Sequence, residues 1–249
     1  MVRKNRVALV TGAGRNLGRE IALALGRSGA DVAVNVRRDL AGAEAVCAEL
    51  RALGVRALPV VADVAAEDEV AAMVLAVVEQ LGPVTVLVNN AGPRAESPLE
   101  NLTRAAWDEV VGAVLTGSFH TCRAAAPGMR ELGWGRIVNV LGAVAHTGQP
   151  NRAHLAAAKA GLLGLTRALA TELGPHGITV NAVSPGPLDT VLPPGLDPRV
   201  RLDRVRHAPI PRLGQAREVA ALVAFLSSED AAFLTGQAVA VNGGEVMLG

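Results

Sequence analysis

A glycine-rich stretch near the start of the chain has the spacing that suits a dinucleotide. The segment TGAGRNLG (11–18) follows a short apolar run and leads into an Ala/Leu-rich run. Gly12, Gly14 and Gly18 permit tight backbone turns and let a pyrophosphate approach the N-terminus of a helix, where free N–H groups attract anions. A strand, this loop and a helix in succession therefore predict a dinucleotide site.

The end of the second apolar run indicates which dinucleotide. Chains that bind NAD usually place an acidic residue there to hold the ribose 2′-hydroxyl, but this chain reads Asn35-Val36-Arg37-Arg38. Guanidinium groups would hold a 2′-phosphate, which a carboxylate would repel. With Arg15 as a second contact from the loop, these residues predict NADP(H). The alternative is that Arg37 and Arg38 only form the solvated end of a strand.

Three basic residues further along could move a proton or hold a polar group. Lys159 and His154 lie in the helix-like stretch 151–170, and His146 lies in the loop before it. Histidine can donate a proton near neutral pH, so His146 and His154 are candidate donors. For each, the alternative is a polar surface residue or a supporting hydrogen bond. No two histidines have the spacing of metal ligands.

The elements that must position these groups alternate regularly. Apolar runs predict strands at 6–11, 31–36, 56–62, 84–90, 135–141, 178–184 and 238–243, with helices between them, among them 41–53 and 67–81. This order predicts an α/β fold: one doubly wound (Rossmann) domain over 1–249, with seven parallel strands and helices on both faces. The Pro/Arg/Asp-rich stretch 186–215 breaks the rhythm after the sixth strand. It is predicted to be an irregular substrate lid, the alternative being a plain surface loop.

Composition excludes several classes of protein. The net charge of +1 gives no reason to expect nucleic acid or an anionic membrane as partner. Two cysteines are too few for a disulfide framework. No apolar run reaches the roughly 20 residues of a membrane helix, so a cytoplasmic protein is the expectation.

Several motifs in order make the chain resemble a short-chain dehydrogenase/reductase, of the branch similar to 3-oxoacyl-[acyl-carrier-protein] reductases. They are TGAGRNLG (11–18), ADV (62–64), NNAG (89–92), Lys159 on its helix, NAVSPG (181–186) and VNGG (241–244). The loop departs from the family pattern TGxxxGxG, because Asn16 stands in place of the middle glycine; asparagine tolerates the positive φ that this position needs.

The resemblance implies where the cofactor would lie. The phosphates would contact the loop, including Leu17, and the adenine would face Asp63 and Val64. The ribose and nicotinamide would lie along Asn90, Ala91 and Gly92. The cover over the nicotinamide would come from Pro185, Gly186, Leu188 and Thr190, and Lys159 would hold the nicotinamide ribose.

The resemblance fails where the proton should come from. The family uses Asn, Ser, Tyr and Lys together, with Tyr as the proton donor. Counting back from Lys159 without gaps places Leu155 at the Tyr position and Gly142 at the Ser position, and Val114 stands for the Asn. None of these side chains donates or accepts a hydrogen bond, and the chain contains no tyrosine at all. The family's ketone chemistry is therefore not a safe expectation.

Three functions of different class are compatible with these residues. The first is an NADP(H)-dependent oxidoreductase with an atypical active site, acting on an imine, an iminium or a conjugated carbonyl, or using His146 or His154 as donor. The second is a catalytically inactive NADP(H)-binding partner or sensor subunit. The third is a non-redox lyase or cyclase. A small-molecule substrate is expected in the first case. The resemblance also implies a homo-oligomer, a dimer or homotetramer, built through helices at 103–130 and 152–173 and the last strand; a hetero-oligomer with an active relative is the alternative.

Overall fold

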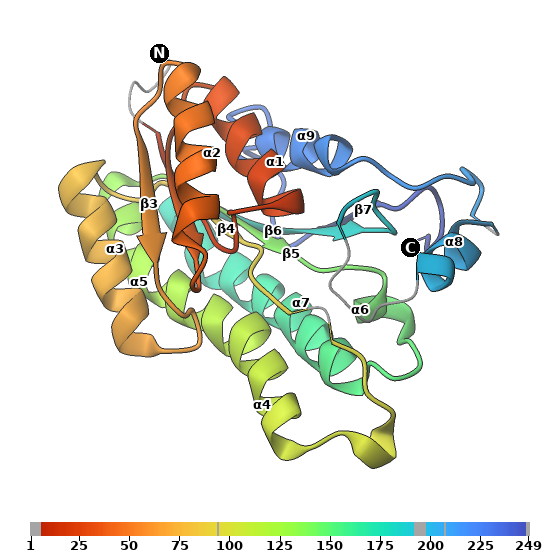
Figure 1. Ribbon diagram of the computed structural model, residues 1–249. Helices are drawn as coiled ribbons and strands as arrows, with labels where there is room; N and C mark the ends of the chain where they lie inside the picture. The colour runs from red at the N-terminus through yellow and green to blue at the C-terminus, as the bar shows by residue number, and fades with distance from the viewer. Residues whose placement is uncertain (1–5, 94, 192–197, 207, 248–249) are drawn as a thin grey trace.

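One parallel sheet forms the centre of the computed structural model, which describes residues 6–93, 95–191, 198–206 and 208–247. The sheet has seven strands in the order β3-β2-β1-β4-β5-β6-β7, and its direction of winding switches between β1 and β4 (Figure 1). The predicted doubly wound fold is confirmed. The strands are β1 (Val7–Val10), β2 (Asp31–Val36), β3 (Ala57–Val61), β4 (Val86–Asn89), β5 (Gly135–Val140), β6 (Ile178–Pro185) and β7 (Ala238–Val241).

Helices cover both faces of the sheet (Figure 1). On one face lie α1 (Asn16–Arg27), α2 (Leu40–Ala52) and α9 (Ala216–Leu226). On the other lie α3 (Glu67–Gln80), α5 (Gly117–Leu132) and α7 (Ala153–Leu173), and α4 (Arg104–Val111) packs against α7. Strand residues alternate between the two apolar cores: Ala8 and Val10 face the α1 side, and Val7 and Leu9 face the α3 side. Burial on both faces explains why each strand reads as a continuous apolar run.

The helical run before β5 contains a break in its regular hydrogen bonding. The helix expected at 103–130 consists of α4, a π-helical turn at Gly112–Thr116, and α5. Such turns replace i→i+4 bonds by i→i+5 bonds and are frequent at functional sites. Val114 lies inside this turn, and it is 1% exposed.

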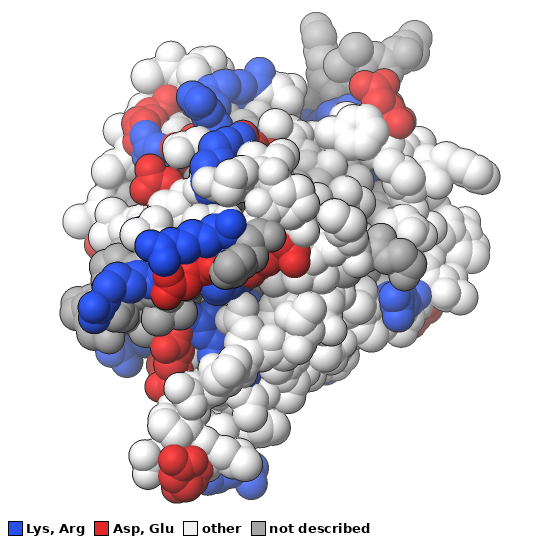
Figure 2. All heavy atoms as spheres, turned by 90° about the vertical axis from the view of Figure 1, so that its right-hand side faces the viewer, with Lys and Arg blue, Asp and Glu red and all other residues white. Residues whose placement is uncertain are grey.

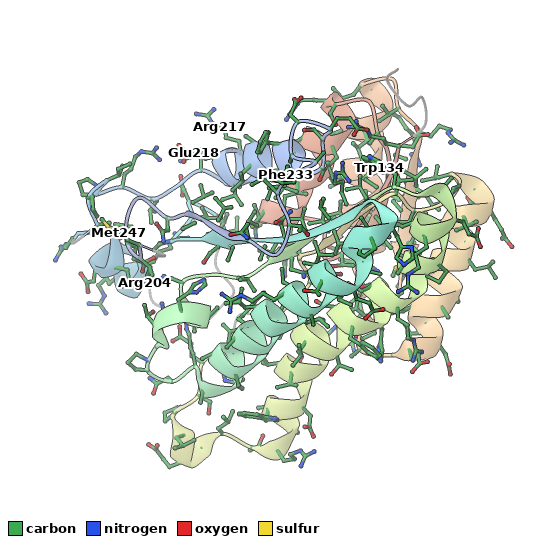
Figure 3. The ribbon with its side chains drawn as sticks, turned by 180° about the vertical axis from the view of Figure 1, so that it is seen from behind. Trp134, Arg204, Arg217, Glu218, Phe233 and Met247 are labelled. Carbon is green, nitrogen blue, oxygen red and sulfur yellow. The ribbon has the colours of Figure 1, made fainter. Side chains whose placement is uncertain are left out.

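The stretch after β6 is more ordered than the sequence indicates. Within the predicted irregular lid the structure has a helix, α8 (Pro198–Arg206), and an isolated bridge between Leu188 and Gly214. Residues 192–197 and 207 lie outside the described part of the chain. Val205 of this helix is buried, and Arg204, labelled in Figure 3, pairs with Glu245 of the C-terminal segment at 2.6 Å. The stretch is therefore not wholly irregular, and its role as a substrate lid stays a prediction.

Candidate functional site

The glycine-rich loop is folded tightly against the ends of β1 and β4. Gly12 has φ +62°, and Asn16 has φ +50°, the left-handed conformation expected for a residue at the glycine position. A Cβ added at Gly14 would lie 2.8 Å from Val36 Cγ1. The sequence therefore closes the loop as a pyrophosphate-binding turn requires, with α1 starting directly behind it.

The segment after β4 braces this loop from the side. Thr11 Oγ1 accepts hydrogen bonds from the backbone N–H groups of Asn90 and Ala91, both at 3.0 Å. In return, Asn90 Nδ2 donates to the carbonyl oxygens of Thr11 at 2.9 Å and Gly12 at 3.1 Å. The NNAG motif thus brings the residues expected beside the ribose, up to Gly92, next to those expected beside the phosphates.

Asn35 supports the loop from the other side. It is 1% exposed, its Oδ1 accepts from the Gly12 N–H at 3.4 Å, and its Nδ2 donates to the Ala62 carbonyl at 3.1 Å. Its side chain fixes the loop to the end of β3. Asp63, at the predicted adenine position, is half-buried beside the buried Val64, and its carboxylate accepts from the Ala65 N–H at 3.0 Å.

The arginines predicted to read the 2′-phosphate lie at the surface. Arg15, Arg37 and Arg38 are exposed. Arg37 Nη1 lies 3.3 Å from Glu109 Oε1 of α4, and both side chains are about half exposed. An exposed pair of this kind contributes little to stability. The 2′-phosphate of a cofactor could therefore replace the Glu109 carboxylate as the partner of Arg37 at a small cost in free energy.

Lys159 projects from α7 toward the carboxyl end of β5. Its side chain is 8% exposed, and Nζ donates to the Val140 carbonyl at 2.5 Å. Burial lowers the pKa of this ammonium to about 8, because desolvation disfavours the charged form.

The three positions expected to carry the proton machinery are apolar. Leu155 lies one turn before Lys159 and packs in a cluster that includes Val114 and Leu141. A Cβ added at Gly92 would lie 2.8 Å from Val114 Cγ2, so Val114 closes the wall beside the ribose segment. Gly142 has φ +147°, and a Cβ there would meet nothing closer than the Pro185 carbonyl at 3.9 Å. Its backbone thus adopts a conformation that a serine would rarely take.

Both candidate histidines are held as neutral bases. His154 is completely buried, and neither ring nitrogen has a hydrogen-bond partner among the residues that the structure describes. Desolvation, and then the charge of Arg152, lower its pKa. His146, in the short helix α6 (Val144–Thr147), has a buried, unpartnered Nε2; burial and then the charge of Arg167 lower its pKa too. Neither imidazole is a ready proton donor near pH 7.

The segment predicted to cover the nicotinamide is joined by hydrogen bonds to β7 and to α8. Gly186 N–H donates to the Val241 carbonyl at 3.1 Å, immediately after Pro185 ends β6. Arg201 Nη1 of α8 donates to the carbonyls of Leu188 at 2.8 Å and Thr190 at 2.9 Å.

One contact at this cover was not predicted from the sequence. Asn16 Nδ2 donates to the Val191 carbonyl at 3.3 Å, and Asn16 Oδ1 accepts from the Val191 N–H at 3.2 Å. The feature of the sequence that could have indicated this contact is Asn16 at a position where the family has glycine. Backbone conformation alone could account for that asparagine.

Two classes of site and segment are absent from the described residues. They contain no group of three or more His, Cys, Asp or Glu side chains placed to hold a metal. Among them, no helix has the length and apolarity to cross a membrane.

The fold and the braced loop define a doubly wound dinucleotide-binding domain, and comparison with known proteins gives its family. Residues 12–245 match the family model described as enoyl-(acyl carrier protein) reductase. The chain belongs to the short-chain dehydrogenase/reductase family.

Relatives in this family match over almost the whole chain. The 3-oxoacyl-[acyl-carrier-protein] reductase FabG of Staphylococcus aureus is 41% identical over 99% of this chain and 100% of its own length. The Pseudomonas aeruginosa FabG is 42% identical over 98% of each. A blue fluorescent protein from a metagenomic library, solved in complex with NADPH, superposes on this chain with a TM-score of 0.91. It is 38% identical, and the match covers 97% of this chain and 98% of its own.

Proposed function

We propose that this chain is an NADP(H)-dependent oxidoreductase whose active site works without a tyrosine, and that its substrate is an imine, an iminium or a conjugated carbonyl compound. The observation that carries the proposal is a contrast within one site. The loop expected to hold the cofactor is closed and braced on both sides, whereas Leu155, Gly142 and Val114 leave the family's Tyr, Ser and Asn positions without a donor.

Support for NADP(H) comes from the charge at the end of β2. Arg37 and Arg38 are exposed there and no acid occupies the strand end, which favours a cofactor with a 2′-phosphate. The structural neighbour at 38% identity binds NADPH. The residues that would hold this cofactor are those of the loop, the NNAG segment and the cover from Pro185 to Thr190.

Support for the substrate class comes from the missing tyrosine, which is the proton donor in the family. When bound, the reduced cofactor supplies a hydride. A ketone such as the FabG substrates also needs a proton at its oxygen, and a positioned acid contributes about 10²–10⁴-fold. An iminium carbon accepts hydride without any proton, and a conjugated carbonyl can be protonated after the hydride has moved.

Titration of NADPH and NADH into the purified protein, followed by nicotinamide fluorescence, tests the cofactor. We expect micromolar NADPH affinity, weaker NADH affinity, and a loss of NADPH affinity in Arg37→Ala. Arg104→Ala is the matched control, because that arginine is exposed on α4 and pairs only locally with Asp108. Binding of neither cofactor would overturn the proposal and favour the non-redox alternative. Tight NADPH binding without turnover of any imine or conjugated carbonyl would favour the inactive partner or sensor.

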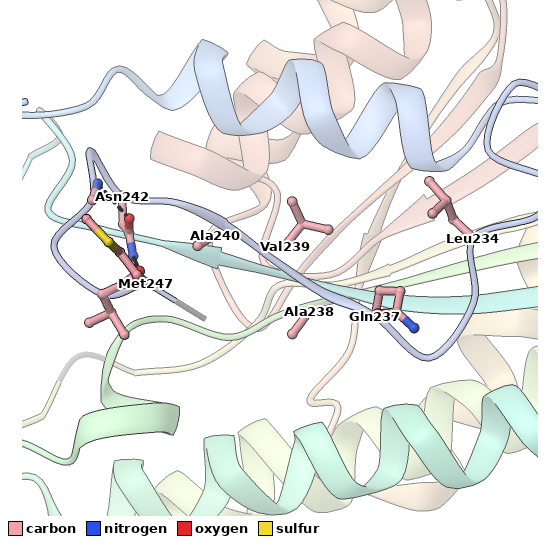
Figure 4. A pocket seen from close by; sticks show the side chains of 9 residues that line it. Leu234, Gln237, Ala238, Val239, Ala240, Asn242 and Met247 are labelled. Carbon is pink, nitrogen blue, oxygen red and sulfur yellow. Dashed lines mark hydrogen bonds between the residues drawn. The ribbon is translucent and has the colours of Figure 1, made fainter. Parts of the chain in front are cut away.

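We further propose that the chain forms a homo-oligomer, dimer or tetramer, through the side that carries β7. Figure 2 shows on this side of the molecule a broad area almost free of charged side chains. A hollow of about 550 Å³ runs along β7 (Figure 4), and none of its lining residues belongs to the cofactor or catalytic set. Phe233 and Met247 on the same side are fully and 79% exposed, respectively (Figure 3).

Light scattering after size exclusion tests the oligomer. We expect a mass of two or four chains, and a shift toward the monomer in Phe233→Asp. The exposed phenylalanine Phe225 lies on α9 and provides the matched control, Phe225→Asp. A monomeric wild-type protein would contradict this assembly.

A further inference from the structure

Lys159 has more hydrogen-bonding capacity than its surroundings use. An ammonium group has three N–H donors. Among the described residues, Val140 O is its one acceptor, although the side chain is 8% exposed. Two of its donors thus remain for a ligand at the carboxyl end of β5, where Val140 lies.

The surroundings of this ammonium carry no competing acid. Leu155, Val114 and Gly142 have no titratable group, and the chain has no tyrosine. The histidines on the neighbouring elements are His146 on α6 and His154 on α7; burial, and then the charges of Arg167 and Arg152 respectively, lower the pKa of each imidazole.

The composition of the chain makes this lysine stand out. Of 24 basic residues, only Lys4 and Lys159 are lysines, and the others are all arginines. Arginine remains protonated at every physiological pH, whereas a buried lysine can release its proton.

We propose that Lys159 is itself the general acid of this site and takes over the proton transfer for which the family uses tyrosine. The inference rests on the proposed oxidoreductase function and names the residue that completes it. The substrate, a conjugated carbonyl, accepts a hydride at its β-carbon from the reduced nicotinamide, which becomes oxidised. The resulting enolate takes a proton from the Lys159 ammonium, and the neutral amine then recovers a proton from solvent.

The position and environment of Lys159 suit this step. Burial lowers the pKa of the ammonium to about 8, so at pH 7 it is mostly protonated yet more acidic than an exposed lysine. No charged neighbour contributes to that shift; desolvation alone causes it. Gly142, two residues after the Val140 acceptor, has no side chain, and a Cβ there would lie 3.9 Å from the nearest atom, the Pro185 carbonyl oxygen.

Two electrophiles separate proton donation from cofactor binding. A preformed iminium ion needs a hydride and no proton, whereas a conjugated carbonyl needs both. Single-turnover oxidation of saturating NADPH is measured with each, for wild type, Lys159→Met and Lys159→Arg. Met keeps the length without the charge, and Arg keeps the charge without an available proton.

We expect both variants to lose about 10²-fold or more in rate with the conjugated carbonyl, beyond any loss with the iminium ion. In wild type, only the carbonyl rate should fall as the pH rises through about 8. An equal loss with both electrophiles would overturn the proton-donor role of Lys159 and leave the oxidoreductase function intact. NADPH that binds wild type but is oxidised by neither would overturn the function itself.

The protein without cofactor offers an independent readout. Lysine labelled with ¹³C and ¹⁵N at the side chain gives only two sets of signals, from Lys4 and Lys159. We expect one set to titrate near pH 8 and to disappear in Lys159→Met. A Lys159 signal that stays protonated up to about pH 10, the range of an ordinary lysine, would overturn the inference.

Discussion

The buried His154 predicts a stability that depends on pH. Both of its ring nitrogens are buried without a partner, and desolvation lowers its pKa in the folded protein. In the unfolded chain the pKa is about 6.5. Below that pH the unfolded state therefore binds a proton that the folded state does not, and the free energy of unfolding falls as the pH falls. The loss reaches at most about 1.4 kcal/mol per pH unit, until the pH reaches the folded pKa.

Replacement of His154 by leucine tests this reasoning, because it removes both unpartnered atoms at similar volume. We expect Leu to stabilise the protein by about 1–3 kcal/mol at pH 7.5, the cost of one buried unsatisfied polar group. The gain should grow as the pH falls to 5.5. Urea unfolding at three pH values measures both effects, with the exposed His176→Gln as control. Equal pH dependence in wild type and His154→Leu would refute the account of His154 as a buried neutral base, and would return it to the candidate proton donors.

Three further substitutions test the loop and the reacting end. Gly18→Ala should abolish NADPH binding and cost about 1–3 kcal/mol of stability, because its Cβ would overlap loop backbone. The control Gly164→Ala should be neutral or stabilising, because a Cβ there meets nothing within 4 Å. Calorimetry and NADPH titration compare the two variants. Asn16→Gly removes the two hydrogen bonds to Val191. NADPH should then dissociate several-fold faster in stopped-flow fluorescence, with thermal stability nearly unchanged. An unchanged dissociation rate would show that this contact does not contribute to cofactor binding. Gly142→Ser should cost about 1–3 kcal/mol of stability, because serine rarely adopts φ +147°, and it should not raise ketone turnover. A gain in ketone turnover without loss of stability would contradict the observed backbone conformation.

The sequence was sufficient for the architecture because the signals there are local and repeated. Strands buried on both faces read as apolar runs, and the predicted ends of β2 coincide with the observed ones. The glycine-rich loop and the NNAG segment can be identified by their residue types alone. The motif pattern also assigns a role to Lys159 and identifies three replaced positions, and these assignments stay predictions.

The remaining features depend on contacts between distant residues. Nothing in PRVRLDRVR predicts α8, because Glu245, some forty residues later, helps to hold it through Arg204. The burial of His154 is a tertiary property, and so are the conformation of Gly142 and the pairing of Arg37 with Glu109. Asn16 was expected to shape the loop, and the structure adds that its amide reaches the segment after β6.

The central claim is that this chain transfers a hydride from NADPH although it has no tyrosine. The most direct measurement incubates the protein with NADPH that carries deuterium at both C4 positions and a cyclic iminium substrate, and determines deuterium in the product by mass spectrometry. The account predicts one deuterium per product molecule, placed at the former iminium carbon, and a transfer that depends on the protein. Bound NADPH that delivers no deuterium to the iminium carbon would contradict it.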